Sequence, residues 1–200
     1  VKIITIEHLM SALFALGINN TLIKINGPEV PILDGSAKQY VDGIIEAGTE
    51  IQNAEIQYIS LNKSFNYADP DSGSEILFLP SDEFKISVVL DYGDSVLGTQ
   101  YAELRNINDY KSEIASCKTF VLLTELENLA KSNLIKGGNL ENAIVMVDRK
   151  DIKVSELKEL AHLIGKESVD IKINGNILNN CELQFYNEPA RHKLLDVIGD

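Results

Sequence analysis

Basic residues and cysteines are scarce in this sequence, and long apolar runs are missing. The 18 lysines and arginines stand against 30 acidic residues, a formal net charge of -12, which argues against binding nucleic acid or an anionic membrane through the overall field. The two cysteines, Cys117 and Cys181, form no CxxC pair and favour a reducing cytoplasm. No apolar run reaches the ~18 residues that span a bilayer, and the first residues lack the form of a signal peptide. We therefore expect a soluble, cytoplasmic protein that meets any anionic ligand with a local positive patch.

The composition is that of a folded protein with a core. Hydrophobic residues make up 44% of the chain and charged residues 24%, which suits one large domain or two small ones. The chain begins at Val1 without an initiator methionine and stops at Asp200 inside a predicted helix, so we interpret it as part of a longer protein. We place a domain boundary near residues 52–56, which gives parts 1–54 and 55–200.

Apolar periodicity predicts loosely alternating helices and strands. Residues 5–17 show the helical spacing, with Thr5 as N-cap and Gly17 as stop, and a capping box at residues 36–39 opens a second helix that ends at Gly48. Further helices are predicted at 107–115, 120–134, 155–165 and 191–200. Strands are predicted at 21–26, 56–61, 75–80, 85–92, 143–148 and 183–187. This pattern indicates an α+β fold with mixed sheets.

Two short stretches combine histidine with acidic side chains. His8 follows Glu7 at the start of a helix, and His192 and Asp196 lie at positions i and i+4 of another helix, which places them on one face. Apolar neighbours surround the second pair, and buried charge needs a partner. Two imidazoles and one carboxylate form a catalytic zinc set. Each pair taken alone also fits a packed or surface histidine beside a carboxylate, and no HExxH motif of a typical zinc protease occurs.

Four segments resemble a known enzyme family. EHLMSALFALGINN, GPEVPILDGSA, IKGGNLENAIV and RHKLLDVIGD are similar, in this order and across essentially the whole chain, to signature segments of UDP-3-O-acyl-N-acetylglucosamine deacetylase. This family comprises the zinc amidases of lipid A biosynthesis in Gram-negative bacteria. The wording of ASCKTF and NEPARHKLLD is similar to Bacteroidetes forms, in which the enzyme is often fused to a 3-hydroxyacyl-carrier-protein dehydratase.

The resemblance implies a fold and a set of roles. The fold would consist of two similar α/β sandwich domains with mixed sheets, the helices packed between the sheets and the active site at the junction. The implied site comprises the Zn²⁺ ligands His8, His192 and Asp196, the general base Glu7, the oxyanion-stabilising Thr119, the substrate contacts Phe120 and Lys193, and Asp200, which orients a further catalytic histidine. That histidine lies downstream of Asp200 in the family, and part of the first domain precedes Val1. We therefore expect this fragment alone to be inactive.

The resemblance also implies an apolar passage for the acyl chain of the substrate, lined by Leu123, Leu126, Ile135 and Leu140. Plain core packing is an equal alternative for Leu123 and Leu126. Lys118 stands where the family usually has arginine, which keeps the charge but loses the planar fork. We assign the loop GPEVPILDGSA no catalytic part, we expect Cys117 to be an inert buried thiol, and we interpret His162 as a solvated surface residue.

The leading hypothesis is zinc-dependent hydrolysis of the N-acetyl group of UDP-3-O-(3-hydroxyacyl)-N-acetylglucosamine, a small-molecule substrate, with release of acetate. One alternative is a bifunctional protein that adds 3-hydroxyacyl-carrier-protein dehydratase activity in its intact form. The other, of a different class, is a metal-free binding domain that retains the fold.

Overall fold

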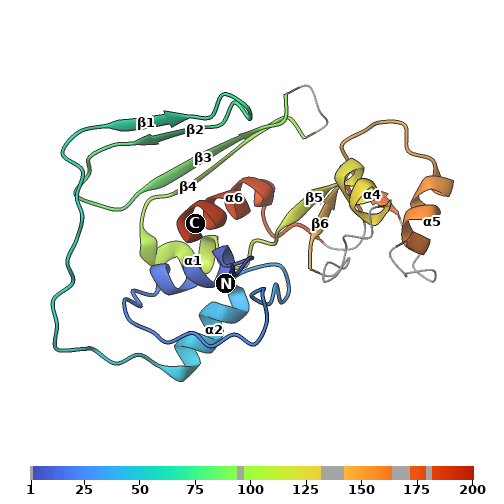
Figure 1. The fold of residues 1–200 in the computed structure, drawn as a ribbon. Helices are drawn as coiled ribbons and strands as arrows, with labels where there is room; N and C mark the ends of the chain where they lie inside the picture. Colours follow the sequence, from blue (N-terminus) through green and yellow to red (C-terminus); the bar gives the residue numbers. More distant parts are fainter. Residues whose placement is uncertain (1, 94–96, 132–141, 164–171, 179–181) are drawn as a thin grey trace.

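The computed structural model describes residues 2–93, 97–131, 142–163, 172–178 and 182–200, and it combines helices with small sheets (Figure 1). In chain order the elements are α1 (Glu7–Ala15), α2 (Lys38–Ala47), β1 (Phe65–Ala68), β2 (Glu75–Phe78), β3 (Ile86–Asp91), β4 (Thr99–Leu104), the 3-10 turn η1 (Ile107–Asp109), α3 (Tyr110–Glu113), β5 (Phe120–Leu122), α4 (Leu123–Lys131), β6 (Ile144–Met146), α5 (Val154–Leu163), β7 (Ile173–Asn174), β8 (Ile177–Leu178) and α6 (Glu188–Gly199). The predicted α+β class is confirmed.

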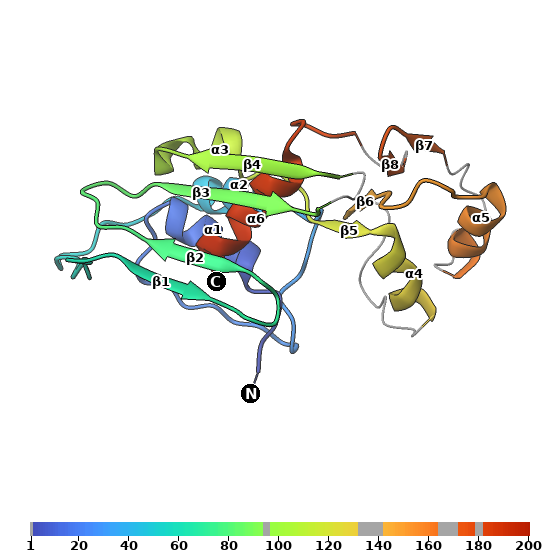
Figure 2. The same cartoon turned by 90° about the horizontal axis from the view of Figure 1, so that it is seen from above.

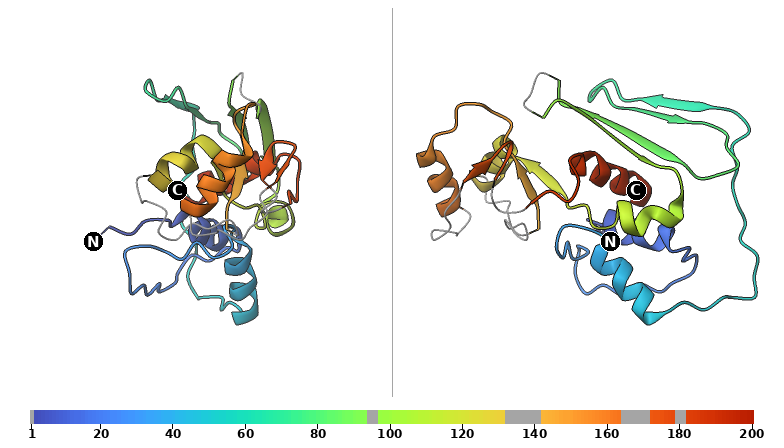
Figure 3. Two further views of the ribbon diagram at one scale, coloured as in Figure 1. Left: turned by 90° about the vertical axis from the view of Figure 1, so that its right-hand side faces the viewer. Right: turned by 180° about the vertical axis from the view of Figure 1, so that it is seen from behind.

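Helices α1 and α6 pack side by side although they lie at opposite ends of the chain (Figures 1 and 3). The antiparallel β3–β4 hairpin covers α6, and α2 packs against α1. Side chains from all these elements share one core cluster, which includes Ala12, Val41, Leu104 and Leu194. Burial of this apolar surface, at about 25 cal/mol per Å², is what holds the two distant helices together.

The strand β3 contributes to this core with one face only. Its residues alternate between half-buried and exposed positions, the period-2 pattern of a strand with one face on a core and one in solvent. The continuous apolar run at 85–92 is typical of a strand buried in a sheet, but Val89 is 65% exposed. The hairpin β1–β2 lies on the same side of α6 (Figures 1 and 2), and both of its strands are exposed.

A second part of the molecule contains a mixed sheet in the order β5-β6-β8-β7. The strands β5 and β6 are parallel, whereas β6–β8 and β8–β7 are antiparallel. Helix α4 packs on β5 and β6, and α5 packs on α4. Leu123, Leu126, Val145, Leu157 and Leu178 are buried in the core cluster of this part. The mixed sheet agrees with the sequence prediction.

Three predicted strands do not form, namely residues 21–26, 56–61 and 183–187. The first two segments have exposed apolar side chains, including Leu22 and Ile59, and among the described residues no strand pairs with them. A strand gains little without a partner for its backbone groups. In the third segment the backbone leads into α6 instead, because the carbonyl of Phe185 accepts the N–H of Glu188 at 3.1 Å.

Two predicted helix starts also differ. The helix predicted from residue 120 begins only at Leu123, because Phe120 pairs with Ile144 in the parallel ladder. The capping box at 36–39 is absent: the Ser36 hydroxyl accepts the N–H of Lys38 at 3.1 Å and donates to the Asp34 carboxylate at 2.8 Å. This is a tight side-chain turn that delivers the chain to α2.

The segment between α2 and β1, residues 48–64, contains no helix or strand. The boundary predicted near residues 52–56 falls inside it, and the division into domains 1–54 and 55–200 stays a prediction. The main core cluster draws on both parts, with Ala12 from one and Leu195 from the other. Across the described ranges, none of the helices combines the length and the apolar character needed to cross a bilayer.

Candidate metal centre

The packing of α1 against α6 brings together the two segments that were predicted to form one metal site. His8 lies in the first turn of α1, and His192 and Asp196 lie one turn apart on α6. Both histidines are almost fully buried, His8 at 2% and His192 at 1% exposure. One ligand atom from each of the three residues lies within 4.8 Å of the others. The structure therefore brings the three predicted ligands together.

The ring of His192 is fixed by the backbone of a third segment. Its Nδ1 lies 3.0 Å from the carbonyl oxygen of Cys117, and a carbonyl oxygen only accepts, so Nδ1 carries the hydrogen and donates. Nε2 faces Oδ1 of Asp196 at 3.2 Å, and in a neutral ring it would hold a lone pair there. Two acceptors at this distance require a proton or a cation between them. The hydrogen bond from Nδ1 to the Cys117 carbonyl also sets the tautomer and the orientation of the His192 ring, as such bonds do for histidines that bind metals.

His8 lies beside His192 and has a ring nitrogen without a partner among the described residues. Its ring meets that of His192 edge-on, with centroids 5.0 Å apart. Within the part of the chain that the structure describes, Nδ1 of His8 is buried and has no hydrogen-bond partner. Burial, and then the nearby charge of His192, lower the pKa of His8 from its ordinary value. His8 is thus held in the neutral form, which is the form that binds metals.

Asp196 is held in the charged form. Burial alone would raise the pKa of its carboxyl group, but hydrogen bonds from His192 and Lys193 outweigh that effect and the pKa is lowered. The ammonium group of Lys193 lies 2.8 Å from Oδ2 of Asp196. Once a cation takes the place of the proton between His192 and Asp196, an ionised carboxylate and two imidazole nitrogens form a donor set for a divalent transition metal.

The spacing of the donors fits such an ion. Around a tetrahedral cation with bonds of about 2.0–2.2 Å, neighbouring donor atoms lie about 3.3 Å apart. The separation of 3.2 Å between His192 Nε2 and Asp196 Oδ1 matches this value, and the 4.8 Å limit for the whole set leaves a small adjustment for His8. Three protein ligands leave a further coordination position, as in catalytic rather than structural sites.

Two more carboxylates lie beside this cluster. Glu7 directly precedes His8 and is half-buried, while Asp200 is exposed at the end of α6. Burial, followed by the charges of Glu7 and Asp196, raises the pKa of Asp200. The carboxyl groups of Glu7 and Asp200 are therefore within electrostatic reach of each other, and both flank the three candidate ligands.

Thr119 lies in the chain segment that holds His192. Its N–H donates to the carbonyl of Gly35 at 2.7 Å, and its own carbonyl accepts the N–H of Ile144 at 2.8 Å. Two residues earlier, Cys117 accepts the hydrogen bond from His192. The predicted role of the Thr119 hydroxyl stays a prediction, but Thr119 lies in the segment that contacts the candidate ligand His192.

The structure also brings Phe120 and Lys193 together. The ammonium group of Lys193 lies 5.8 Å from the centroid of the Phe120 ring, which is within the range of a cation–π interaction. Because Lys193 also pairs with Asp196, the two predicted substrate contacts border the candidate ligands. Their contact with a substrate stays a prediction.

The predicted acyl passage involves residues in another part of the molecule. Leu123 and Leu126 are buried in the core cluster that contains Val145 and Leu157, which agrees with the alternative of plain core packing. Ile135 and Leu140 lie outside the described residues, as does the side chain of His162. The passage itself stays a prediction.

Two residues at the centre were missed by the sequence reasoning. Glu188 is buried at 1% exposure and accepts the backbone N–H of Lys118 at 2.9 Å. Asp34 lies close enough to His8 for its charge to raise the pKa of that ring. The signal for Glu188 is its place directly before the proline at the start of a helix. The signal for Asp34 is its place in the Asp-Gly-Ser turn, to which the sequence analysis gave no catalytic part.

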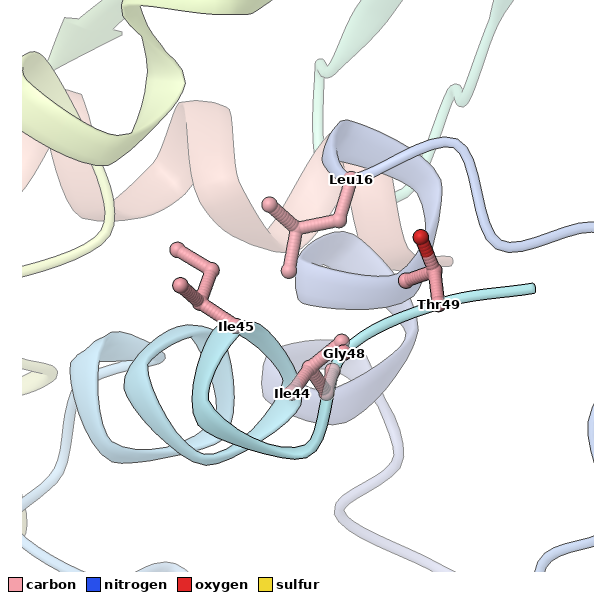
Figure 4. Close-up of a pocket in the computed structure, with 5 residues that line it drawn as sticks. All are labelled: Leu16, Ile44, Ile45, Gly48 and Thr49. Carbon is pink, nitrogen blue, oxygen red and sulfur yellow. The ribbon is translucent and has the colours of Figure 1, made fainter. Parts of the chain in front are cut away.

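The pockets found elsewhere on the surface do not contain the candidate ligands. One, of about 270 Å³, lies between the ends of α1 and α2 and is lined by Leu16, Ile44, Ile45, Gly48 and Thr49 (Figure 4). A second, of about 210 Å³, includes Arg149 and Gly175. Neither holds a group of metal-ligating side chains.

Fold and site together define an α+β protein with a candidate metal site of two histidines and one aspartate. Residues 1–162 match the UDP-3-O-acyl N-acetylglycosamine deacetylase family. Similar proteins include the bifunctional enzyme LpxC/FabZ of Bacteroides thetaiotaomicron, 44% identical over 100% of this chain and 43% of that protein, and that of Porphyromonas gingivalis, 43% identical with the same coverage. The UDP-3-O-acyl-N-acetylglucosamine deacetylase of Chlamydia pneumoniae is 37% identical over 99% of this chain and 61% of that protein.

The chain belongs to the UDP-3-O-acyl N-acetylglycosamine deacetylase family. The resemblance found in the sequence motifs is thereby confirmed. The chain spans less than half the length of the two bifunctional relatives and about three fifths of the Chlamydia pneumoniae relative.

Proposed function

We propose that this chain carries the metal centre of a zinc-dependent deacetylase that hydrolyses the N-acetyl group of UDP-3-O-(3-hydroxyacyl)-N-acetylglucosamine and releases acetate. The reaction belongs to lipid A biosynthesis, and we place it in the cytoplasm of a Gram-negative bacterium. The observation that carries the proposal is the convergence of His8, His192 and Asp196 within 4.8 Å from two distant helices. Family membership supports the substrate class.

The donor set favours zinc over hard cations, because imidazole nitrogen is a poor ligand for magnesium or calcium. When bound, the ion activates water near neutral pH and polarises the acetamide carbonyl. The protein's part is to hold His8 neutral, to orient His192 through the Cys117 carbonyl, and to keep Asp196 ionised.

Glu7 is the proposed general base. Glu7 is half-buried and precedes His8, and its charge acts on the His8 ring, so we expect its carboxylate to accept the proton of the attacking water. The Thr119 hydroxyl is proposed to donate a hydrogen bond to the oxyanion of the tetrahedral intermediate. One well-placed donor of this kind is worth about 3 kcal/mol in the transition state.

Phe120 and Lys193 are proposed to contact the sugar and the diphosphate. Lys193 supplies positive charge in a chain of net charge -12, which a diphosphate needs locally. The acyl chain would occupy the passage assigned to Leu123, Leu126, Ile135 and Leu140. Asp200, whose pKa is raised by burial and by Glu7, is proposed to orient a further histidine that protonates the departing amine.

The test uses the intact gene product and two histidine variants. Release of acetate from the UDP-sugar substrate should stop on treatment with a chelator and return with added Zn²⁺. His192→Ala should abolish turnover and zinc binding, whereas His162→Ala, the matched histidine control, should change neither. A zinc-free protein whose behaviour is unchanged in His192→Ala would instead identify a metal-free binding domain.

A second activity in the intact protein is a separate candidate. It is favoured by the printed names of relatives such as those of Bacteroides thetaiotaomicron and Porphyromonas gingivalis, which are bifunctional. We propose that the intact protein also dehydrates 3-hydroxyacyl groups on a carrier protein. A dehydratase assay on the intact gene product tests this, and activity that survives His192→Ala would place it in a different site.

A further inference from the structure

The segment 117–119 has nearly all of its backbone groups bonded to other parts of the molecule. The N–H of Cys117 donates to Ile114, that of Thr119 donates to Gly35, and the Thr119 carbonyl accepts from Ile144. The remaining peptide group, formed by the carbonyl of Cys117 and the N–H of Lys118, is different because side chains hold it. Its carbonyl accepts from Nδ1 of His192 at 3.0 Å, and its N–H donates to Oε1 of Glu188 at 2.9 Å.

Both of these side chains come from one helix. Glu188 and His192 lie at positions i and i+4 of α6, so they project from the same face. The peptide group between Cys117 and Lys118 is planar and rigid. Two side chains of α6 therefore bond this peptide group, one at its carbonyl and one at its N–H. A rotation of the peptide group that lengthened one hydrogen bond would also disturb the other.

Glu188 is itself held firmly. It is 1% exposed, and its second oxygen, Oε2, accepts the N–H of Gln184 at 2.6 Å. Burying a carboxylate costs free energy unless hydrogen-bond donors satisfy it. A buried glutamate at position 188 is therefore expected to have a specific role. The start of α6, where backbone N–H groups favour a negative charge, further stabilises it.

We propose that Glu188 is a positioning residue of the metal centre. Its carboxylate fixes the peptide group of Cys117 and Lys118, and through the Cys117 carbonyl it fixes the tautomer and orientation of His192. Through the same segment it sets the position of Thr119. The inference rests on the proposed function, since it assigns Glu188 a part in holding a metal ligand and an oxyanion donor.

Glu188→Gln tests this in the intact protein with little change in shape. An amide has one acceptor oxygen, whereas both partners of Glu188 are N–H donors, so one N–H is left facing another donor. In the zinc form, kcat should fall roughly 10- to 100-fold with KM unchanged, as is usual when a group behind a metal ligand is altered. In the Co²⁺-substituted protein, affinity for Co²⁺ should fall about 10-fold or more, and the visible absorption bands should shift.

Asn187→Ala is the matched control. Asn187 is also buried at the start of α6, but its side chain donates to the carbonyl of Tyr101 at 2.6 Å and accepts from Arg191 at 3.0 Å. The substitution removes hydrogen bonds at the same end of α6 but changes no contact of segment 117–119. The control should lose stability yet keep the Co²⁺ affinity and spectrum of the unmodified protein. Equal Co²⁺ affinity and spectra in both variants would overturn the inference and reduce Glu188 to a structural residue.

A measurement on the unmodified protein covers the case in which Glu188→Gln does not fold. The amide proton of Lys118 should resonate far downfield and exchange slowly with solvent, because it donates to a buried carboxylate. Rapid exchange at Lys118 would overturn the inference. A different result, an intact protein with neither Co²⁺ binding nor deacetylase activity, would overturn the proposed function itself, and the two failures are therefore distinct.

Discussion

Gly199 on α6 lies so close to Glu7 on α1 that a Cβ atom at Gly199 would come within 2.0 Å of the Glu7 carbonyl oxygen. The two backbones are therefore in direct contact beside the candidate ligands. Glu7 precedes His8, and Gly199 follows Asp196 by less than one turn. The absence of a side chain at Gly199 is what allows the two helices to bring the three candidate ligands together.

Gly199→Ala should force α1 and α6 apart. We expect a loss of about 1–3 kcal/mol in the free energy of unfolding, as for other overpacked sites, and a marked fall in zinc affinity because His8 moves away from His192. Gly43→Ala in α2 is the control, because a Cβ there meets nothing within 4 Å. Urea unfolding and zinc titration of the two variants check this. Zinc affinity that is normal in Gly199→Ala would show that the contact does not set the metal geometry.

Glu7→Ala and Asp196→Ala should separate catalysis from metal binding. Removing the proposed base should leave zinc bound but lower kcat by about 10²- to 10⁴-fold, the usual share of a general base. Removing the carboxylate ligand should weaken zinc binding itself. Zinc content after dialysis, measured beside kcat, distinguishes the two variants, and an equal loss of zinc in both would contradict the separate roles.

The metal-free protein should lose stability as the pH falls below about 6.5. Burial and the charge of His192 lower the pKa of His8 from 6.5, so the unfolded chain binds a proton before the folded chain does, and unfolding is favoured as pH falls. Hydrogen bonds that lower the pKa of Asp196 from 3.8 extend the loss to lower pH. His8→Gln should flatten the dependence near pH 6.5 in urea unfolding. A pH profile identical to that of the unmodified protein would contradict this account.

Cys117 should be unreactive toward thiol reagents in the folded protein. Burial raises the pKa of its thiol to about 12, and its side chain is fully buried, so almost no thiolate is present or accessible at pH 8. In a Cys181→Ser background, iodoacetamide should label Cys117 only after addition of denaturant. Rapid labelling of the native protein would show that the segment holding His192 opens readily.

The candidate site was accessible from the sequence because its signals are local. The spacing of His192 and Asp196 on one helix face, together with Glu7 and His8 at a helix start, indicated a metal centre before any contact was known. The motifs then supplied the pairing of the two segments. Periodicity likewise found α1, α2 and α6, because each helix buries one apolar stripe in the shared core.

What the sequence did not reveal depends on contacts between distant residues. The strands predicted at 21–26 and 56–61 have the right composition, but a strand forms only where another strand supplies hydrogen bonds. Glu188 fell between the strand predicted at 183–187 and the helix predicted at 191–200, and its partner Lys118 lies 70 positions away in the chain. The close approach of Gly199 to Glu7 has no signal in either segment alone.

Anomalous diffraction at the zinc absorption edge, from crystals of the intact protein grown with Zn²⁺, tests the central claim most directly. The account predicts one strong peak about 2.0–2.2 Å from a ring nitrogen of His8, from His192 Nε2 and from an Asp196 carboxylate oxygen. No peak at this position, or a peak that His8 does not reach, would contradict it.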